Sequence, residues 1–113
     1  MLPTKINYRP YPHYLLKLVT LVERELVVIT IIGLDKTGIV AGVSNVLAEN
    51  NVNIEDISQT ILNKYFAMIM LVNTSKSKIS LEELQKRLSE KGAEMNLEIK
   101  VQHENVFKAI HRI

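Results

Sequence analysis

The sequence of 113 residues contains no cysteine and no tryptophan, and aromatic residues make up only 5% of it. Without cysteine the chain has no disulfides, no thiol nucleophile and no thiolate metal site. The histidines (His13, His103 and His111) are scattered and include no pair at i, i+4, so we predict no metal site. No apolar run approaches the ~20 residues that span a bilayer, which argues against a membrane protein. We expect no cofactor.

Charge of one sign is also lacking. Residues 26–113 carry ten basic and ten acidic side chains, which excludes the basic patch of a nucleic-acid binder. The predicted central strands offer only Phe66 and Tyr65 for base stacking. Glu55 and Asp56 are adjacent and face opposite sides of a strand, so they form no acid–base pair. With no Ser/His/Asp constellation either, we predict that the chain is not an enzyme.

Residues 1–25 differ from the rest, because they hold all three prolines and three of the four tyrosines. We expect an N-terminal arm here, with a short helix over residues 13–23. Alternatively, the natural start lies nearer Val22 and the upstream residues come from a misassigned start codon. The apolar run at 14–22 is interrupted by Lys17 and lacks a small-residue cleavage site, unlike a signal peptide. We therefore expect a cytoplasmic protein.

From Leu26 onwards the hydrophobic pattern is regular and predicts a single domain over residues 26–113. The predicted elements are strands over 26–32, 52–62, 65–72 and 95–102, and helices over 37–49, 81–92 and 104–113. Asn50 and Asn51 suit the end of the first helix. Ser80 and Glu83 form a capping box that begins the second, and Gly92 is placed to end it. The order is βαββαβ with a terminal helix.

The polarity of the strands predicts their order in the sheet. The first and third strands are apolar on both faces, which is typical of central strands, whereas the second and fourth carry polar residues suited to edges. With right-handed crossovers this gives an α+β, ferredoxin-like sandwich with an antiparallel sheet in the order 4-1-3-2. Two helices cover only one face of such a sheet. The other face needs a partner subunit, the arm or the terminal helix to cover it.

A turn with glycine at both ends, Gly33-Leu34-Asp35-Lys36-Thr37-Gly38, joins the first strand to the first helix. The backbone N–H groups of a helix N-terminus attract an anion, and the carboxylate of Asp35 attracts a cation. A place that offers both suits a zwitterion such as a free amino acid.

Three blocks in order, residues 33–44, 53–60 and 103–113, resemble the ACT domain, a small regulatory module that typically binds amino acids. They are most similar to stand-alone ACT proteins, with related domains in the glycine cleavage regulator and in formyltetrahydrofolate deformylase. The resemblance covers about residues 26–113. It implies dimers, often side by side through sheets or helices, with the ligand at the interface. The ligand-binding residues that it implies are Leu34, Asp35, Lys36, Thr37, Gly38, Ile39, Val40, Asn53 and Ile54.

Several of these residues also have ordinary structural interpretations. Asp35 could cap the helix or bond the N–H groups of its own turn, and Thr37 is the expected N-cap. Gly33 and Gly38 suit special backbone angles or close approach, and Gly42 suits helix–sheet packing. Lys36 is expected to be a solvated turn residue, and Asn53 could merely begin its strand.

Two functions follow from these observations. The first is a small-molecule sensor, a homodimer or higher even oligomer that binds an amino acid and signals to an unidentified protein partner. The alternative is a protein-interaction or structural subunit that binds no ligand, in which the turn is only a capped turn.

Overall fold

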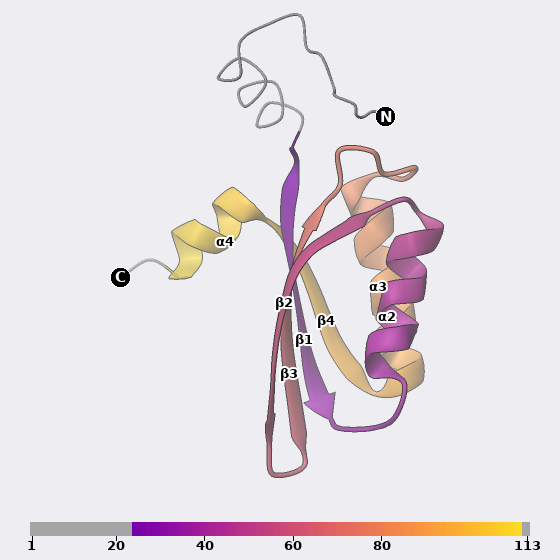
Figure 1. Cartoon of the computed structure of the whole chain (residues 1–113), viewed down its shortest axis with the longest axis vertical. Helices are drawn as coiled ribbons and strands as arrows, with labels where there is room; N and C mark the ends of the chain where they lie inside the picture. The colour runs from indigo at the N-terminus through magenta and orange to yellow at the C-terminus, as the bar shows by residue number, and fades with distance from the viewer. Residues whose placement is uncertain (1–23, 112–113) are drawn as a thin grey trace, which may run out of the picture.

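The computed structural model describes residues 24–111 and shows the predicted βαββαβ order with a terminal helix (Figure 1). The elements are β1 (Leu26–Leu34), α2 (Ile39–Glu49), β2 (Asn53–Leu62), β3 (Tyr65–Asn73), α3 (Leu81–Met95), β4 (Leu97–His103) and α4 (Glu104–His111). The N-terminal arm expected over residues 1–25, with its helix over 13–23, lies outside the described residues except for Arg24 and Glu25.

The four strands form one antiparallel sheet in the order β2-β3-β1-β4, which confirms the predicted arrangement. Central β1 pairs with β3 from Leu26 opposite Asn73 to Leu34 opposite Tyr65. The outer strands are β2 and β4, and among residues 24–111 the partner of β2 is β3 alone. The pairing of β2 shifts register between Ile54 and Asp56, which marks a β-bulge near the start of this edge strand.

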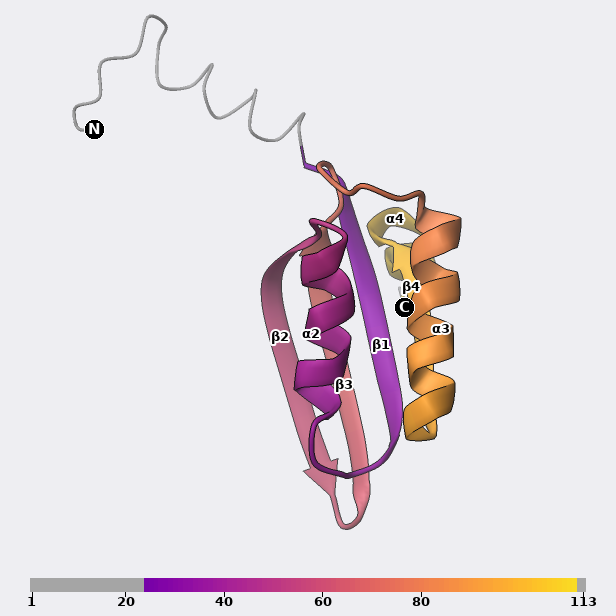
Figure 2. The same ribbon diagram turned by 90° about the vertical axis from the view of Figure 1, so that its right-hand side faces the viewer.

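The core lies between the sheet and the two helices α2 and α3, which cover the same face (Figures 1 and 2). Successive side chains of a strand point to opposite faces, so every second residue of the central strands enters this core. The strand residues buried there include Val27, Ile29, Ile31, Phe66, Met68, Met70 and Val72. Their helical partners are Ile39, Val43 and Leu47 on α2 and Leu84 and Leu88 on α3.

Two glycine predictions are wrong in detail. Gly92 does not end its helix; α3 continues to Met95 and ends at Asn96, whose left-handed backbone (φ 58°) forms the C-cap. Gly92 is instead buried where α3 packs closely against β4. A Cβ at this position would lie only 2.7 Å from the carbonyl oxygen of Leu97, so the close approach requires glycine. Gly42 packs against a helix rather than the sheet, since its Cβ would lie 3.1 Å from the sulfur of Met95 on α3.

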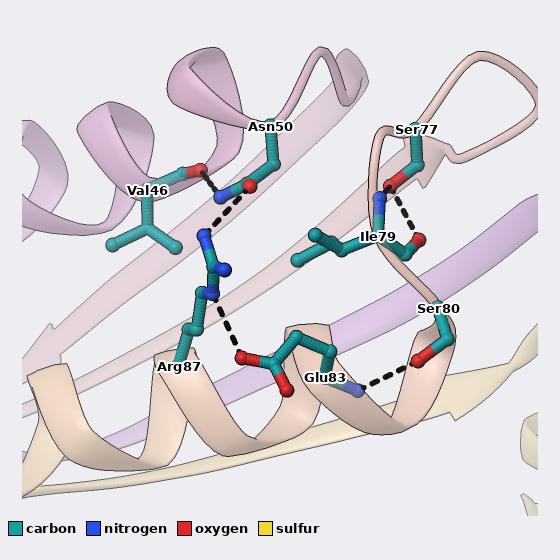
Figure 3. Close-up of polar contacts among 7 residues, drawn as sticks. All are labelled: Val46, Asn50, Ser77, Ile79, Ser80, Glu83 and Arg87. Atoms are coloured by element: carbon teal, nitrogen blue, oxygen red, sulfur yellow. Dashed lines mark hydrogen bonds and ion pairs between the residues drawn. The ribbon is translucent and has the colours of Figure 1, made fainter.

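A hydrogen-bonded cluster ties the end of α2 to α3 (Figure 3). Buried Asn50, at the C-cap of α2, donates to the carbonyl of Val46 (2.8 Å) and accepts from Arg87 (3.0 Å). Asn50 thus ends α2 as predicted. One half of the predicted capping box forms, because Ser80 Oγ accepts from the N–H of Glu83 (3.1 Å). The Glu83 carboxylate accepts from Arg87 Nε (3.0 Å).

The other face of the sheet, here called the open face, is only partly covered. The terminal helix α4 lies on this side, opposite α2 and α3, and contacts β1 and β4 (Figure 1). Val28 faces this side and is 5% exposed, whereas Ile32, further along β1, is 53% exposed. Three segments were predicted to cover this face: a partner subunit, the N-terminal arm or the terminal helix. Of these, the terminal helix covers one end of the face.

Candidate functional site

The turn between β1 and α2 is held at one end by the neighbouring hairpin and at the other by a left-handed glycine. Strand β1 continues to Leu34, two residues beyond the prediction, and Asp35 then donates its N–H to the carbonyl of Lys64 (2.8 Å). Gly38, with φ 89°, is the N-cap of α2, so the prediction of Thr37 at that position is wrong. A glycine accepts positive φ without strain, so the chain enters the helix one residue later.

The start of α2 keeps its backbone donors available. Within the described part of the chain no side chain caps the helix, and its first hydrogen bond runs from the N–H of Gly42 to the carbonyl of Gly38 (2.9 Å). The N–H groups of Ile39, Val40 and Ala41 precede that bond and have no intrahelical acceptor. Together with the positive end of the helix dipole, they form a place where an anionic group is stabilised.

The carboxylate of Asp35 is exposed, and no other residue among 24–111 bonds it. The alternative interpretation of Asp35 as a side-chain cap of α2 is therefore wrong. Lys36, Thr37 and Gly38 are exposed beside it. This turn thus presents a free carboxylate next to free helix donors, which is the charge pattern expected for binding a zwitterion.

The flanking residues of the predicted site divide into two groups. Val40 is 39% exposed on the first turn of α2 and can line a ligand site. Ile39 is 2% exposed and belongs to the core, so its side chain positions the helix and leaves only its N–H for a ligand. Leu34 lies on the open face and is half exposed there.

Asn53 and Ile54 are not brought to the turn within one chain. Asn53 pairs with Asn73, which pairs with Leu26, at the end of the sheet far from Leu34. Eight residues of strand separate the two levels, about 26 Å at ~3.3 Å per residue. Asn53 Nδ2 donates to Glu55 Oε2 there (3.2 Å), and Ile54 packs against the core.

A polar hollow that the sequence analysis did not identify lies at that far end. Its volume is ≈ 400 Å³, and it is lined mainly by Asn51, Asn53, Asn73, Ser75 and Lys76. The run Asn50-Asn51-x-Asn53 is the only sequence signal for it, and such a run is equally typical of turns. Inside residues 24–111 there is no cluster of three metal-ligating side chains. No helix of this same range has the length and apolar character needed to cross a membrane.

Comparison with known proteins gives a consistent result. The family model described as "ACT domain" matches residues 25–102. A UPF0237 protein of Methanocaldococcus jannaschii is 56% identical over 87 residues, which is 77% of this chain and 97% of that protein. An ACT domain protein from Streptococcus pneumoniae is 40% identical with a TM-score of 0.65, covering 75% of this chain and 96% of that one. The ligand-free regulatory subunit of aspartate kinase from Thermus thermophilus is 25% identical with a TM-score of 0.57, covering 69% and 51%.

Proposed function

This chain belongs to the ACT domain family, and we propose that it is a non-catalytic regulatory module that binds a free amino acid between two copies of itself. ACT domains are, in general, small-molecule-binding regulatory modules. The observation that carries the proposal is the pairing of the free Asp35 carboxylate with the uncapped N-terminus of α2. The carboxylate of the ligand would accept from the helix N–H groups, and its ammonium would lie against Asp35.

A second copy is needed to complete this site. The turn over Asp35–Gly38 is exposed, and it lines none of four hollows that residues 24–111 form elsewhere on the surface. Asn53, the other polar residue implied in binding, lies at the far end of its own sheet. A single chain therefore supplies one wall of the site only.

The free edge of β2 supports a particular arrangement of the two copies. This ten-residue strand contains no proline, and β3 is its only strand partner in the described range 24–111. If β2 pairs antiparallel with β2 of a second copy, the Asn53 end of one strand meets the Leu62 end of the other. Leu62 lies level with Tyr65 and Leu34, beside the turn that carries Asp35. Each turn then receives Asn53 and Ile54 from the other chain.

Exposed apolar side chains on β2 favour the same pairing. Ile57 and Ile61 lie on the helix-facing side of β2, opposite Met70 and Phe66, and both are more than a third exposed. In this pairing Ile57 lies near the two-fold axis, close to Ile57 of the other copy, and Ile61 lies beside Ile54 of the other copy. A ligand that bonds both chains binds the paired state better than the separated state, so it shifts the population towards the dimer. A protein partner that recognises the dimer would receive the signal.

A thermal-shift screen against the twenty amino acids tests the ligand. A ligand at ~100 times its dissociation constant should add about 2.7 kcal/mol of stability, which is several degrees for a domain of this size. Asp35→Asn should remove the shift without changing the melting temperature of the free protein. Glu90→Gln, on the exposed side of α3, is the matched control and should keep the shift. A shift that survives Asp35→Asn would contradict the proposed site.

Mixing two variants tests whether the site is shared. Asp35→Asn and Asn53→Ala should each abolish binding, because every site of either homodimer has lost one partner. A mixed dimer has one doubly altered site and one intact site. Calorimetry of the refolded mixture should therefore recover binding, at one ligand per mixed dimer. If the mixture binds no ligand although both variants fold and associate, the site does not combine Asp35 and Asn53 from two chains.

The thermal-shift screen also tests the alternative function. If no amino acid changes the melting temperature, the result would favour the interaction module that binds no ligand.

A further inference from the structure

We propose that the open face of the sheet is a second contact surface between copies of this chain, in which α4 of each copy lies over exposed apolar residues of the other. This surface is distinct from the free edge of β2, and it does not depend on the ligand.

The sheet contributes an apolar strip to this surface. Residues directly opposite each other in an antiparallel pair share a face, so the register assigns five large exposed side chains to the open face. The strip consists of Ile32, Leu34, Leu62, Tyr65 and Ile69. They come from three adjacent strands and lie in the half of the face beyond Val28, which is itself buried.

Helix α4 contributes the complementary part. Val106 and Ile110 are four residues apart, so they lie on one side of the helix, and they are 50% and 61% exposed. Ile110 borders a hollow of ≈ 340 Å³ between α4 and the sheet, which is also lined by Thr30, Ile32, Glu98, Lys100 and Gln102. Figure 1 shows α4 projecting from the open face at one end of the sheet. The helix thus leaves apolar side chains uncovered next to an uncovered apolar strip.

Two properties of this surface point to a second copy as the occupant. First, the hollow beside Ile110 reaches to the level of Thr30 and Ile32, whereas the strip continues beyond that level to Leu34, Leu62 and Tyr65. A two-fold axis that crosses the strands therefore places α4 of each copy over that further part of the strip of the other. Second, β4 presents Glu98 and Lys100 on the open face, two residues apart. The same axis runs the two β4 strands antiparallel and lets the acid of one copy face the base of the other.

The size of the surface fits this role. Five side chains of the strip and two of α4 are each about half exposed or more, and polar residues border them on β2 and β4. Together they supply roughly the 800 Å² per partner that a stable interface buries. An isolated chain would leave an apolar patch larger than is usual for a monomer.

Cross-linking tests the arrangement directly, because the natural chain has no cysteine and any introduced thiol is unique. Leu34→Cys and Ile110→Cys are made and purified separately, mixed, and treated with a short bis-maleimide. The proposal predicts a dimer band that is much stronger in the mixture than in either variant alone. Leu34→Cys mixed with Glu90→Cys is the matched control and should give none, since Glu90 lies on the exposed side of α3.

The molar mass of two further variants completes the test. Ile69→Lys changes the strip and Ile110→Lys changes α4, and each should halve the mass of the assembly measured by light scattering. Glu90→Lys should leave the mass unchanged. The amino-acid response of Ile69→Lys should persist, which separates this surface from the ligand site. If both variants keep the mass of the wild-type assembly and the mixture gives no cross-linked dimer, the proposal is wrong. The occupant of the open face would then be residues 1–23 or another protein.

Discussion

Two helical glycines, Gly42 on α2 and Gly92 on α3, differ in what surrounds them. A Cβ at Gly92 would lie 2.7 Å from a backbone carbonyl oxygen, whereas a Cβ at Gly42 would meet the flexible end of Met95 at 3.1 Å. Gly92→Ala should destabilise the fold by about 2 kcal/mol, because the backbone of β4 must move. Gly42→Ala should stabilise it by about 0.5 kcal/mol, since the ~1 kcal/mol of helix propensity exceeds the cost of moving one thioether. Urea unfolding of both variants measures the difference, and equal effects would contradict this account.

At the same residue scale, the sequence predicted the special backbone angle of Gly38 but not the cap of the helix that follows. No residue among 24–111 bonds the Asp35 carboxylate, and its role towards a ligand stays a prediction. The N-cap was misassigned because threonine is a common cap, while a left-handed glycine ends the turn here. The role of Gly92 was also missed, because it depends on the carbonyl of Leu97 in a strand that the helix packs against.

At the scale of elements, one buried amide provides the polar contact between the end of α2 and α3. Asn50 is 4% exposed, bonds Val46 and Arg87 through its side chain, and accepts from Lys78 N–H through its carbonyl (3.0 Å). Asn50→Ala should destabilise the protein by about 2 kcal/mol, because it removes a partner of buried polar groups. Glu83→Gln weakens only the exposed pair with Arg87 and should cost less than ~0.5 kcal/mol. Urea unfolding compares them, and a similar loss in both variants would assign the contact to the ion pair instead.

Helix α4 is positioned by the residue that precedes it. The N–H of Asn105 donates to His103 Nδ1 (3.1 Å), so this ring nitrogen acts as a cap for the first turn. Nδ1 must then be unprotonated, which leaves the proton on Nε2, where it faces Glu25 Oε2 at 3.4 Å. Because α4 follows β4 without a loop, this cap sets the direction in which Val106 and Ile110 are presented.

The elements themselves were predictable because their signals are local. Alternation and helical periodicity located the strands and helices of residues 24–111, and the apolar character of β1 and β3 placed them at the centre. The position of Asn53 follows from the topology, since α2 returns the chain to the end of the sheet where β1 began. What the sequence could not provide is which chain completes the site, because that depends on surfaces that two copies bring together.

At the scale of the whole molecule, the free edge of β2 and the open face predict a hierarchy of assembly. With both contacts the wild-type protein should be a tetramer. Ile61→Lys should break only the edge contact, because this exposed residue lies on the helix-facing side of β2, and should leave dimers joined through the open face. Ile61→Lys combined with Ile69→Lys should give monomers. Analytical ultracentrifugation distinguishes these states, and a monomeric Ile61→Lys single variant would show that the two contacts do not form independently.

The placement of Asp35 and Asn53 at opposite ends of one sheet has a quantitative consequence for a site that needs both. Association of the chains and capture of the ligand become a single linked equilibrium, so the apparent affinity rises with the amount of protein present. At abundances below the dissociation constant of the pair, the amino acid is released even when its own level is unchanged. Such a module responds to the product of two concentrations, and a cell could retune its threshold through expression alone.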